Sequence, residues 1–301
     1  MNIPGEIKIV EVGPRDGLQN ETQIISLENK VRLINLLSDS GISAIETGSF
    51  VSSKWVPQMA QTSEDFGSIQ RYPGVSYSAL TPNLRGLHDA IEARVEEVAV
   101  FAASTESFSK KNINCSIDDS LDTFSKVCKK AKEKGIKVRG YLSCVFGCPY
   151  EGDVKIEKVL QVASRLIEIG CYEVSLGDTI GTGTPIKAKE LVNCLKNTIP
   201  AKRLAVHFHD TFGLGLANIL SVIEEGIHTV DSAVSGLGGC PYAEGASGNV
   251  ATEDVLYMLD SMGIKTSINL NKVLEASWFI ADVLGRDPIS KVARALKSRR
   301  K

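Results

Sequence analysis

Eight short apolar segments recur along the chain, and longer segments with helical spacing separate them. The short segments are rich in β-branched residues, as buried strands are. They are Lys8 to Gly13, Ala44 to Gly48, Ser76 to Leu80, Glu97 to Ala102, Lys137 to Ser143, Glu173 to Gly177, Leu204 to His209 and Thr229 to Ser235. Strands that alternate with helices form parallel sheets, so this order predicts an α/β protein. Eight such units predict a TIM (β/α)8 barrel.

The segments between the strands contain glycines that are typical of helix C-termini. Gly41, Gly135, Gly170 and Gly226 each follow a helical run and precede a strand, where a left-handed C-cap residue is useful. The helical runs include Leu27 to Ser38, Ser120 to Lys134, Ile156 to Ile169, Pro185 to Asn197 and Gly215 to Glu225. Two more, Thr252 to Asp260 and Leu270 to Leu284, follow the last strand. We therefore expect a single catalytic domain over 1–301, with a C-terminal helical extension from about residue 265 to 301.

A doubly wound open sheet is the alternative architecture, and it is weakened because no Gly-rich dinucleotide fingerprint follows the first strand. The formal net charge is −2, so the chain lacks the excess of positive charge that is typical of nucleic-acid-binding proteins. No apolar run approaches the length of a membrane span, and the first strand begins at Lys8, so we expect no membrane, no leader peptide and a cytoplasmic location. Seven cysteines, an odd number, favour reduced thiols.

Polar residues gather where the predicted strands end, which is where TIM barrels place their catalytic groups. His207 and His209 are two apart on one strand, so both imidazoles point to the same face. Asp16 follows the first strand, which only one strand separates from the seventh around a closed barrel. The alternative is hydrogen-bonded core histidines, with Arg15-Asp16-Gly17 as a tight turn and surface ion pair. Two histidines at this spacing beside an acid favour a metal site.

The donor set also narrows the choice of cation. Two histidines and one carboxylate match non-heme iron oxygenases, which are usually built on another fold. Here the amide of Asn249 is available as a further hard oxygen ligand. The set Asp16, His207, His209 and Asn249 therefore favours Mg²⁺ or Mn²⁺.

Cys240 is the thiol singled out by its surroundings, because it lies in a Gly-rich loop from Gly236 to Asn249 after the last strand. We expect it to transfer protons. Cys144 and Cys148 are spaced too widely for the usual metal pair, so packing is the better interpretation. The remaining cysteines, Cys115, Cys128, Cys171 and Cys194, are expected to be buried apolar side chains.

The segment Gly177 to Pro185 has the glycines of a phosphate loop but lacks its Lys-Ser/Thr ending. We interpret it as a strand-to-helix turn that exposes Asp178, with Pro185 as the first helical residue.

Together these segments resemble the hydroxymethylglutaryl-CoA lyase family of metal-dependent TIM-barrel lyases over almost the whole chain. The run Gly13 to Glu21 looks like the family's opening motif, and Lys110 to Asn114 like its fourth-strand loop. The run from Ser235 through Cys240 to Asn249 looks like its cysteine signature. The resemblance implies a carbon–carbon lyase acting on a small-molecule CoA thioester, 3-hydroxy-3-methylglutaryl-CoA, and a homodimer.

The resemblance also implies a division of roles. Asp16, His207, His209 and Asn249 would hold the metal, and Arg15 would face the thioester carbonyl. Glu46 and Asp178 would support the site and Cys240 would act as the acid, while Asp16 or Asp178 would be the base. Lys110 and Lys111 are candidate neighbours of the CoA phosphates.

Four alternatives stand beside the favoured lyase. Isopropylmalate and homocitrate synthases share the Arg-Asp start and the His-x-His strand, but have a shorter last loop and a regulatory extension. Biotin-dependent carboxyltransferase domains carry a modified lysine near the metal, whereas strand six here ends Leu176-Gly177-Asp178. A catalytically silent barrel that binds CoA esters, or a lyase for a related 3-hydroxy acyl-CoA, would keep the same scaffold.

Overall fold

Eight parallel strands close into a barrel, as predicted. The structure is a computed structural model that describes residues 3–240 and 243–299, with the backbone alone for residues 240, 243–247 and 299. Around the barrel the order is β1-β10-β9-β8-β5-β4-β3-β2. The bounds are β1 Lys8–Glu11, β2 Ala44–Ser49, β3 Ser76–Leu80, β4 Glu97–Ala103, β5 Lys137–Ser143, β8 Glu173–Asp178, β9 Leu204–Phe208 and β10 Thr229–Ser232. The first and last strands pair in register, with Lys8 opposite Thr229 and Glu11 opposite Ser232.

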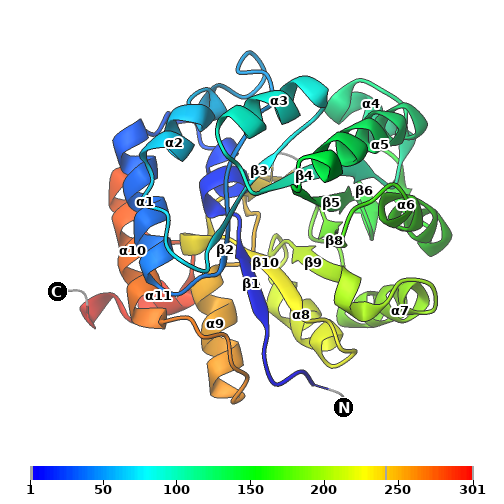
Figure 1. Cartoon of the computed structure of the whole chain (residues 1–301). Coiled ribbons are helices and arrows are strands. Elements are labelled where there is room, and N and C mark those ends of the chain that lie inside the picture. The colour runs from blue at the N-terminus through cyan, green and yellow to red at the C-terminus, as the bar shows by residue number, and fades with distance from the viewer. Residues whose placement is uncertain (1–2, 241–242, 300–301) are drawn as a thin grey trace.

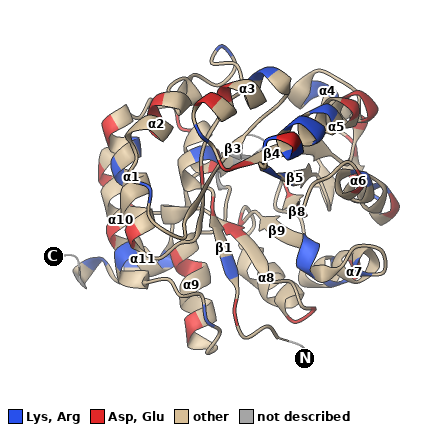
Figure 2. Cartoon of the chain, viewed as in Figure 1, with Lys and Arg blue, Asp and Glu red and all other residues tan. Residues whose placement is uncertain are grey.

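Helices surround the strands (Figure 1) and return the chain from each strand to the next. Those in the barrel layer are α1 Leu27–Asp39, α2 Thr62–Ser68, α3 Leu84–Glu92, α4 Glu106–Ile113, α5 Ile117–Glu133, α6 Ile156–Glu168, α7 Pro185–Lys196 and α8 Gly215–Ile223. Their apolar faces are buried against the strands, as for Leu33 and Leu37 of α1. Acidic and basic residues are interspersed over the outer faces (Figure 2).

Local sequence signals account for several helix ends. Ser116 and Thr184 accept hydrogen bonds from the backbone N–H groups of Asp119 and Lys187, and so cap α5 and α7. The cap explains why α5 begins at Ile117, three residues before the predicted Ser120. Pro185 is the first residue of α7, as expected. The four predicted C-cap glycines have φ between 72° and 119°, the left-handed region where glycine is favoured.

Three strands stop earlier than predicted: β9 ends at Phe208, one residue before His209, and the early ends of β1 and β10 shape the site. The chain leaves β1 at Glu11 and enters a π-helical turn, Gly13–Gly17, that carries Arg15 and Asp16. It leaves β10 at Ser232 and enters a 3-10 turn, Val234–Gly236. Glu11 joins the two turns, because one oxygen of its carboxylate accepts hydrogen bonds from Gly13 at 2.8 Å and Val234 at 2.9 Å.

Three helices follow the last strand: α9 Thr252–Ser261, α10 Leu270–Val283 and α11 Lys291–Ala295. Helix α10 packs beside α1 (Figure 1), and the Trp278 indole donates to the Ala293 carbonyl at 3.1 Å, which fastens α11 to α10. Short 3-10 turns lie at Pro57–Met59, Ala201–Arg203 and Lys297–Arg299. No helix within residues 3–240 and 243–299 has the length and apolar character needed to cross a bilayer.

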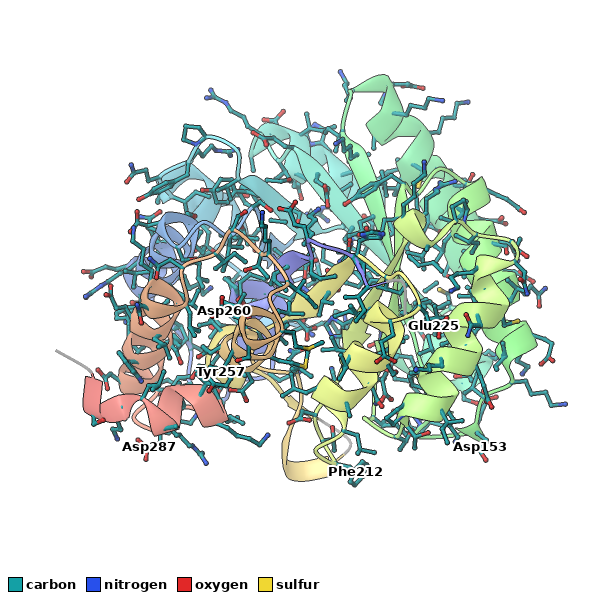
Figure 3. The ribbon with its side chains drawn as sticks, turned by 90° about the horizontal axis from the view of Figure 1, so that it is seen from below. Asp153, Phe212, Glu225, Tyr257, Asp260 and Asp287 are labelled. Atoms are coloured by element: carbon teal, nitrogen blue, oxygen red, sulfur yellow. The ribbon has the colours of Figure 1, made fainter. Side chains whose placement is uncertain are left out.

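Two small antiparallel hairpins lie outside the barrel. One pairs β6 Gly147–Cys148 with β7 Gly152–Asp153, and the other pairs β11 Gly239–Cys240 with β12 Ala243–Ser247. Asp153 and Phe212, which follow β5 and β9, lie along the same border of the molecule (Figure 3). The loops after the strands therefore gather at one end of the barrel.

Candidate active site

A cavity of about 810 Å³ opens at the end of the barrel where the strands finish. Arg15 and Asp16 of the π-helical turn line it, together with His207, His209 and Thr179. Its apolar wall comes from strand ends and α5: Leu80, Phe101, Phe124 and Tyr141. Ligand sites of TIM barrels lie at this end because the loops there can vary without disturbing the barrel.

Asp16, His207 and His209 come together in the cavity. One ligand atom from each lies within 4.8 Å of the others, and Nε2 of His207 is 3.7 Å from Oδ2 of Asp16. His207 lies in β9 and His209 directly follows it, and this two-residue spacing together with the closure of β1 onto β10 brings about the meeting, as the sequence predicted. A carboxylate with two imidazoles at this separation fits a divalent cation.

Asn249 lies beside this group although it follows Asp16 by 233 positions. Its backbone forms an antiparallel bridge with His209. Its amide nitrogen donates to Oδ2 of Asp16 at 2.8 Å and to the Leu237 carbonyl at 3.2 Å. Both donors are engaged by these contacts, so the amide oxygen is the atom left for a cation.

Of the three titratable candidate ligands, Asp16 and His209 have the protonation states that suit metal binding. Burial raises the pKa of Asp16, but the positive charges of Arg15 and His207 outweigh it and lower that pKa to about 2. Burial, with repulsion from His207, lowers the pKa of His209 to about 4. Burial also disfavours charge on His207, yet contacts with Asp231 and Asp16 raise its pKa. Asp16 is therefore anionic and His209 neutral at pH 7, the forms that ligate metals.

Arg15 is fixed between two carboxylates. Its Nε donates to Glu46 at 2.5 Å and its Nη1 to Asp16 at 2.6 Å, while its guanidinium lies 5.4 Å from the centre of the Tyr141 ring. Burial disfavours its charge, but Glu46 and Asp16 raise its pKa above the ordinary value. It is 6% exposed, so the predicted alternative of a surface ion pair is wrong. A permanent positive charge thus borders the candidate metal group.

The other oxygen of Glu46, Oε1, has no hydrogen-bond partner among the described residues. Burial raises the pKa of Glu46, although the charge of Arg15 opposes the shift. Glu46 thus lies in the second strand, as predicted, and its contact with Arg15 was not predicted.

A buried network behind His207 was missed by the sequence analysis. Asp231 of β10 approaches Nδ1 of His207 at 3.3 Å and accepts two hydrogen bonds from Arg139, at 3.0 and 2.8 Å. Arg139 also donates to Glu173 at 2.8 Å and to the Tyr141 hydroxyl at 3.1 Å. Charged residues in the middle of predicted barrel strands were the available signal, because such positions stay charged only when they are paired.

Asp178 is buried, so the prediction that its turn exposes it is wrong. Its two oxygens accept from the backbone N–H groups of Thr182 at 3.1 Å and Gly183 at 2.8 Å. Burial raises its pKa to about 6. The neighbouring residue Thr179, not Asp178, lines the cavity. Asp178 therefore holds the β8–α7 turn and lies away from the cavity surface.

The cysteines divide between packing and the cavity. Cys144 and Cys148 are buried in one apolar cluster, as expected, and Cys128 and Cys171 are also buried. Cys115 and Cys194 are only half-buried, and Cys115 lines the cavity, so their expected burial is wrong. The backbone of Cys240 lies in β11, next to the cavity-lining Gly239, while its side chain lies outside the described residues. Of the two candidate lysines, Lys111 lines the cavity.

Known proteins with the same arrangement identify the family. The HMGL-like family model matches residues 6–280. The rat protein named "3-hydroxy-3-methylglutaryl-CoA lyase, cytoplasmic" is 56% identical over 293 residues, covering 97% of this chain and 85% of the rat protein. A Pseudomonas aeruginosa protein named "3-hydroxy-3-isohexenylglutaryl-CoA/hydroxy-methylglutaryl-CoA lyase" is 54% identical over 296 residues, covering 98% and 99%.

Structural comparison agrees. The crystal structure of hydroxymethylglutaryl-CoA lyase from Pseudomonas aeruginosa superimposes with a TM-score of 0.98 and 53% identity, over 100% of both chains. Sequence, fold and the polar strand ends therefore lead to one conclusion: the chain belongs to the HMGL-like family.

Proposed function

We propose that this chain is a divalent-metal-dependent lyase that cleaves 3-hydroxy-3-methylglutaryl-CoA to acetyl-CoA and acetoacetate. The observation that carries the proposal is the meeting of Asp16, His207 and His209 beside the fixed cation Arg15 in one cavity. Cleavage of a tertiary alcohol next to a thioester needs both a group that promotes loss of the hydroxyl proton and a cation near the forming enolate.

Asp16, His207, His209 and Asn249 would hold Mg²⁺ or Mn²⁺. A bound divalent cation supplies Lewis acidity that lowers the pKa of the substrate hydroxyl. Asp231 would keep the Nδ1 proton of His207 in place and so aim Nε2 at the cation.

Arg15 would face the thioester oxygen. Its contacts with Glu46 and Asp16 fix the guanidinium before the substrate arrives, so little reorganisation is needed as charge develops on that oxygen. Stabilisation of this kind is worth about 3 to 4 kcal/mol of barrier for a single donor.

The proton inventory balances with one base and one acid. The base takes the hydroxyl proton, the C2–C3 bond breaks, its electron pair stays on C2, and the acid protonates C2 to give acetyl-CoA. Asp16 faces the cavity and is the base that we propose, directly or through a water, whereas the burial of Asp178 away from the cavity argues against it. Cys240, on the loop next to Gly239, is the proposed acid.

The test is product analysis with purified protein and hydroxymethylglutaryl-CoA, with and without a chelator. We expect acetoacetate and acetyl-CoA in equal amounts, lost on chelation and restored by Mg²⁺ or Mn²⁺. Absence of cleavage by the metal-loaded protein would remove the proposal, and condensation of acetyl-CoA with a keto acid would support a synthase.

A lyase for a related 3-hydroxy acyl-CoA is a second candidate. The apolar side chains Leu80, Phe101 and Tyr141 line the cavity, and the name of the Pseudomonas relative includes an isohexenylglutaryl-CoA substrate beside the methyl one. Turnover of thioesters with longer substituents at C3, measured beside the methyl substrate, decides between them.

A cytoplasmic location and a homodimer remain predictions. Cell fractionation tests the first. Sedimentation velocity across a range of protein concentrations tests the second.

A further inference from the structure

Trp55 is the most exposed large apolar side chain of those described, at 87%. Tryptophan usually buries most of its indole, so such exposure calls for a ligand or a partner. Trp55 lies at the cavity that contains the candidate metal group, where it follows Ser52 in a turn beyond β2. The indole is therefore exposed at the site itself and not on a remote face.

The turn that carries Trp55 is held in place on both sides. The backbone N–H groups of Trp55 and Val56 both donate to the Ser52 carbonyl, at 2.9 and 3.1 Å. The next 3-10 turn is anchored by the buried Gln58, whose side chain accepts from Ile25 at 3.0 Å. An exposed ring on an anchored backbone is a preformed surface, and little ordering is needed when a flat ligand lies on it.

The cavity has room for more than a small acyl group. Its volume of about 810 Å³ is that of a site for a drug-sized molecule. Apolar side chains, including Val51, Leu80 and Phe124, line the cavity that Arg15 and Trp55 share. That lining suits an elongated thioester arm with its reacting end near Arg15 and its other end near the indole.

Charge near Trp55 favours an anion. Lys111 lines the same cavity, and Lys54 adjoins Trp55 in the sequence and is exposed. Neither lysine takes part in an ion pair among the described residues. Asp16 is the one acidic residue among the described cavity-lining side chains.

We propose that Trp55 is the stacking surface for the adenine of the CoA thioester, with Lys111 and Lys54 facing its phosphates. The inference rests on the proposed function, because it takes the substrate to be a CoA ester. Bases stack on aromatic rings with a gain that corresponds to about 5- to 150-fold in affinity.

The test uses the intrinsic fluorescence of the whole protein. The chain has two tryptophans, and the other, Trp278, is 7% exposed and hydrogen-bonded to Ala293. We expect CoA and adenosine 3′,5′-bisphosphate to quench the solvent-exposed emission and pantetheine not to. The Trp55→Phe variant should lose that emission and its quenching.

Binding and kinetics give the second readout. Calorimetric titration should show CoA binding at least about fivefold more weakly to Trp55→Ala, with partial recovery in Trp55→Phe. KM for the thioester should rise in the alanine variant more than kcat falls. Tyr257→Ala is the matched control, since Tyr257 is 54% exposed on α9 and does not line the cavity.

The outcomes separate the two proposals. If Trp55→Ala cleaves the thioester with the CoA affinity and KM of the parent protein, the stacking role alone is overturned. The role is also overturned if the tryptophan emission of the ligand-free protein is already shielded from solvent and shifts on dilution, because Trp55 would then lie in a contact between copies of the chain. Absence of both cleavage and CoA binding in the parent protein would remove the proposed function.

Discussion

Replacing Asp231 by Asn tests the network behind His207. The substitution keeps the shape of the side chain but removes a negative charge that faces Arg139 at 2.8 and 3.0 Å. Removing one partner of a buried ion pair typically costs about 3 to 5 kcal/mol of unfolding free energy. Arg139 keeps Glu173 as a partner at 2.8 Å, so we expect the lower end of that range, measured by urea unfolding.

The same substitution should also weaken metal binding. Asp231 lies 3.3 Å from Nδ1 of His207, and loss of a carboxylate in that position typically reduces metal affinity about 10- to 100-fold. Calorimetric titration of the apo protein with Mn²⁺ measures this directly, without reference to turnover.

Glu173→Gln provides the matched control. Glu173 pairs with the same guanidinium and accepts from Thr229 at 3.0 Å, but the hydrogen bonds of His207 do not include it. We expect Glu173→Gln to destabilise the protein to a similar extent and to leave Mn²⁺ affinity unchanged. Equal Mn²⁺ affinity in Asp231→Asn and the parent would refute the orienting role, whatever the change in stability.

Three further substitutions test other parts of the site, and a fourth tests Glu253, a buried carboxyl group of α9 that does not line the cavity. His209→Ala should weaken Mn²⁺ binding to the apo protein, and unchanged affinity would count against ligation. Arg15→Met should lower kcat more than it raises KM. A rise in KM with unchanged kcat would instead assign Arg15 to substrate recognition. Cys240→Ser should keep the fold, checked by circular dichroism, and lose most turnover; near-parental turnover would exclude the thiol as the acid. Burial raises the pKa of Glu253 from 4.5 to about 8, so its contribution to stability is complete below about pH 4.5 and is lost as pH rises through about 8. Glu253→Gln should therefore flatten the fall in unfolding free energy between about pH 4.5 and pH 8, by about 5 kcal/mol, and an unchanged slope would contradict the shift.

Local sequence patterns determined the barrel and much of the candidate site. Short apolar runs and helical apolar spacing depend on neighbours in the chain, so the eight strands, and the C-cap glycines such as Gly170, could be located from the sequence. The spacing of His207 and His209 on one strand fixed their common face for the same reason. A known parallel barrel order then brought Asp16 close to them.

Other features depended on contacts that no local pattern encodes. The partner of Asp231 is Arg139, 92 positions away in the sequence. The exposure of Trp55 beside the cavity likewise depends on how separate loops meet above the barrel. Periodicity specifies which face of an element is apolar, but the pairing of charges across a closed barrel is set by strand register and loop packing, and only the tertiary structure decides those.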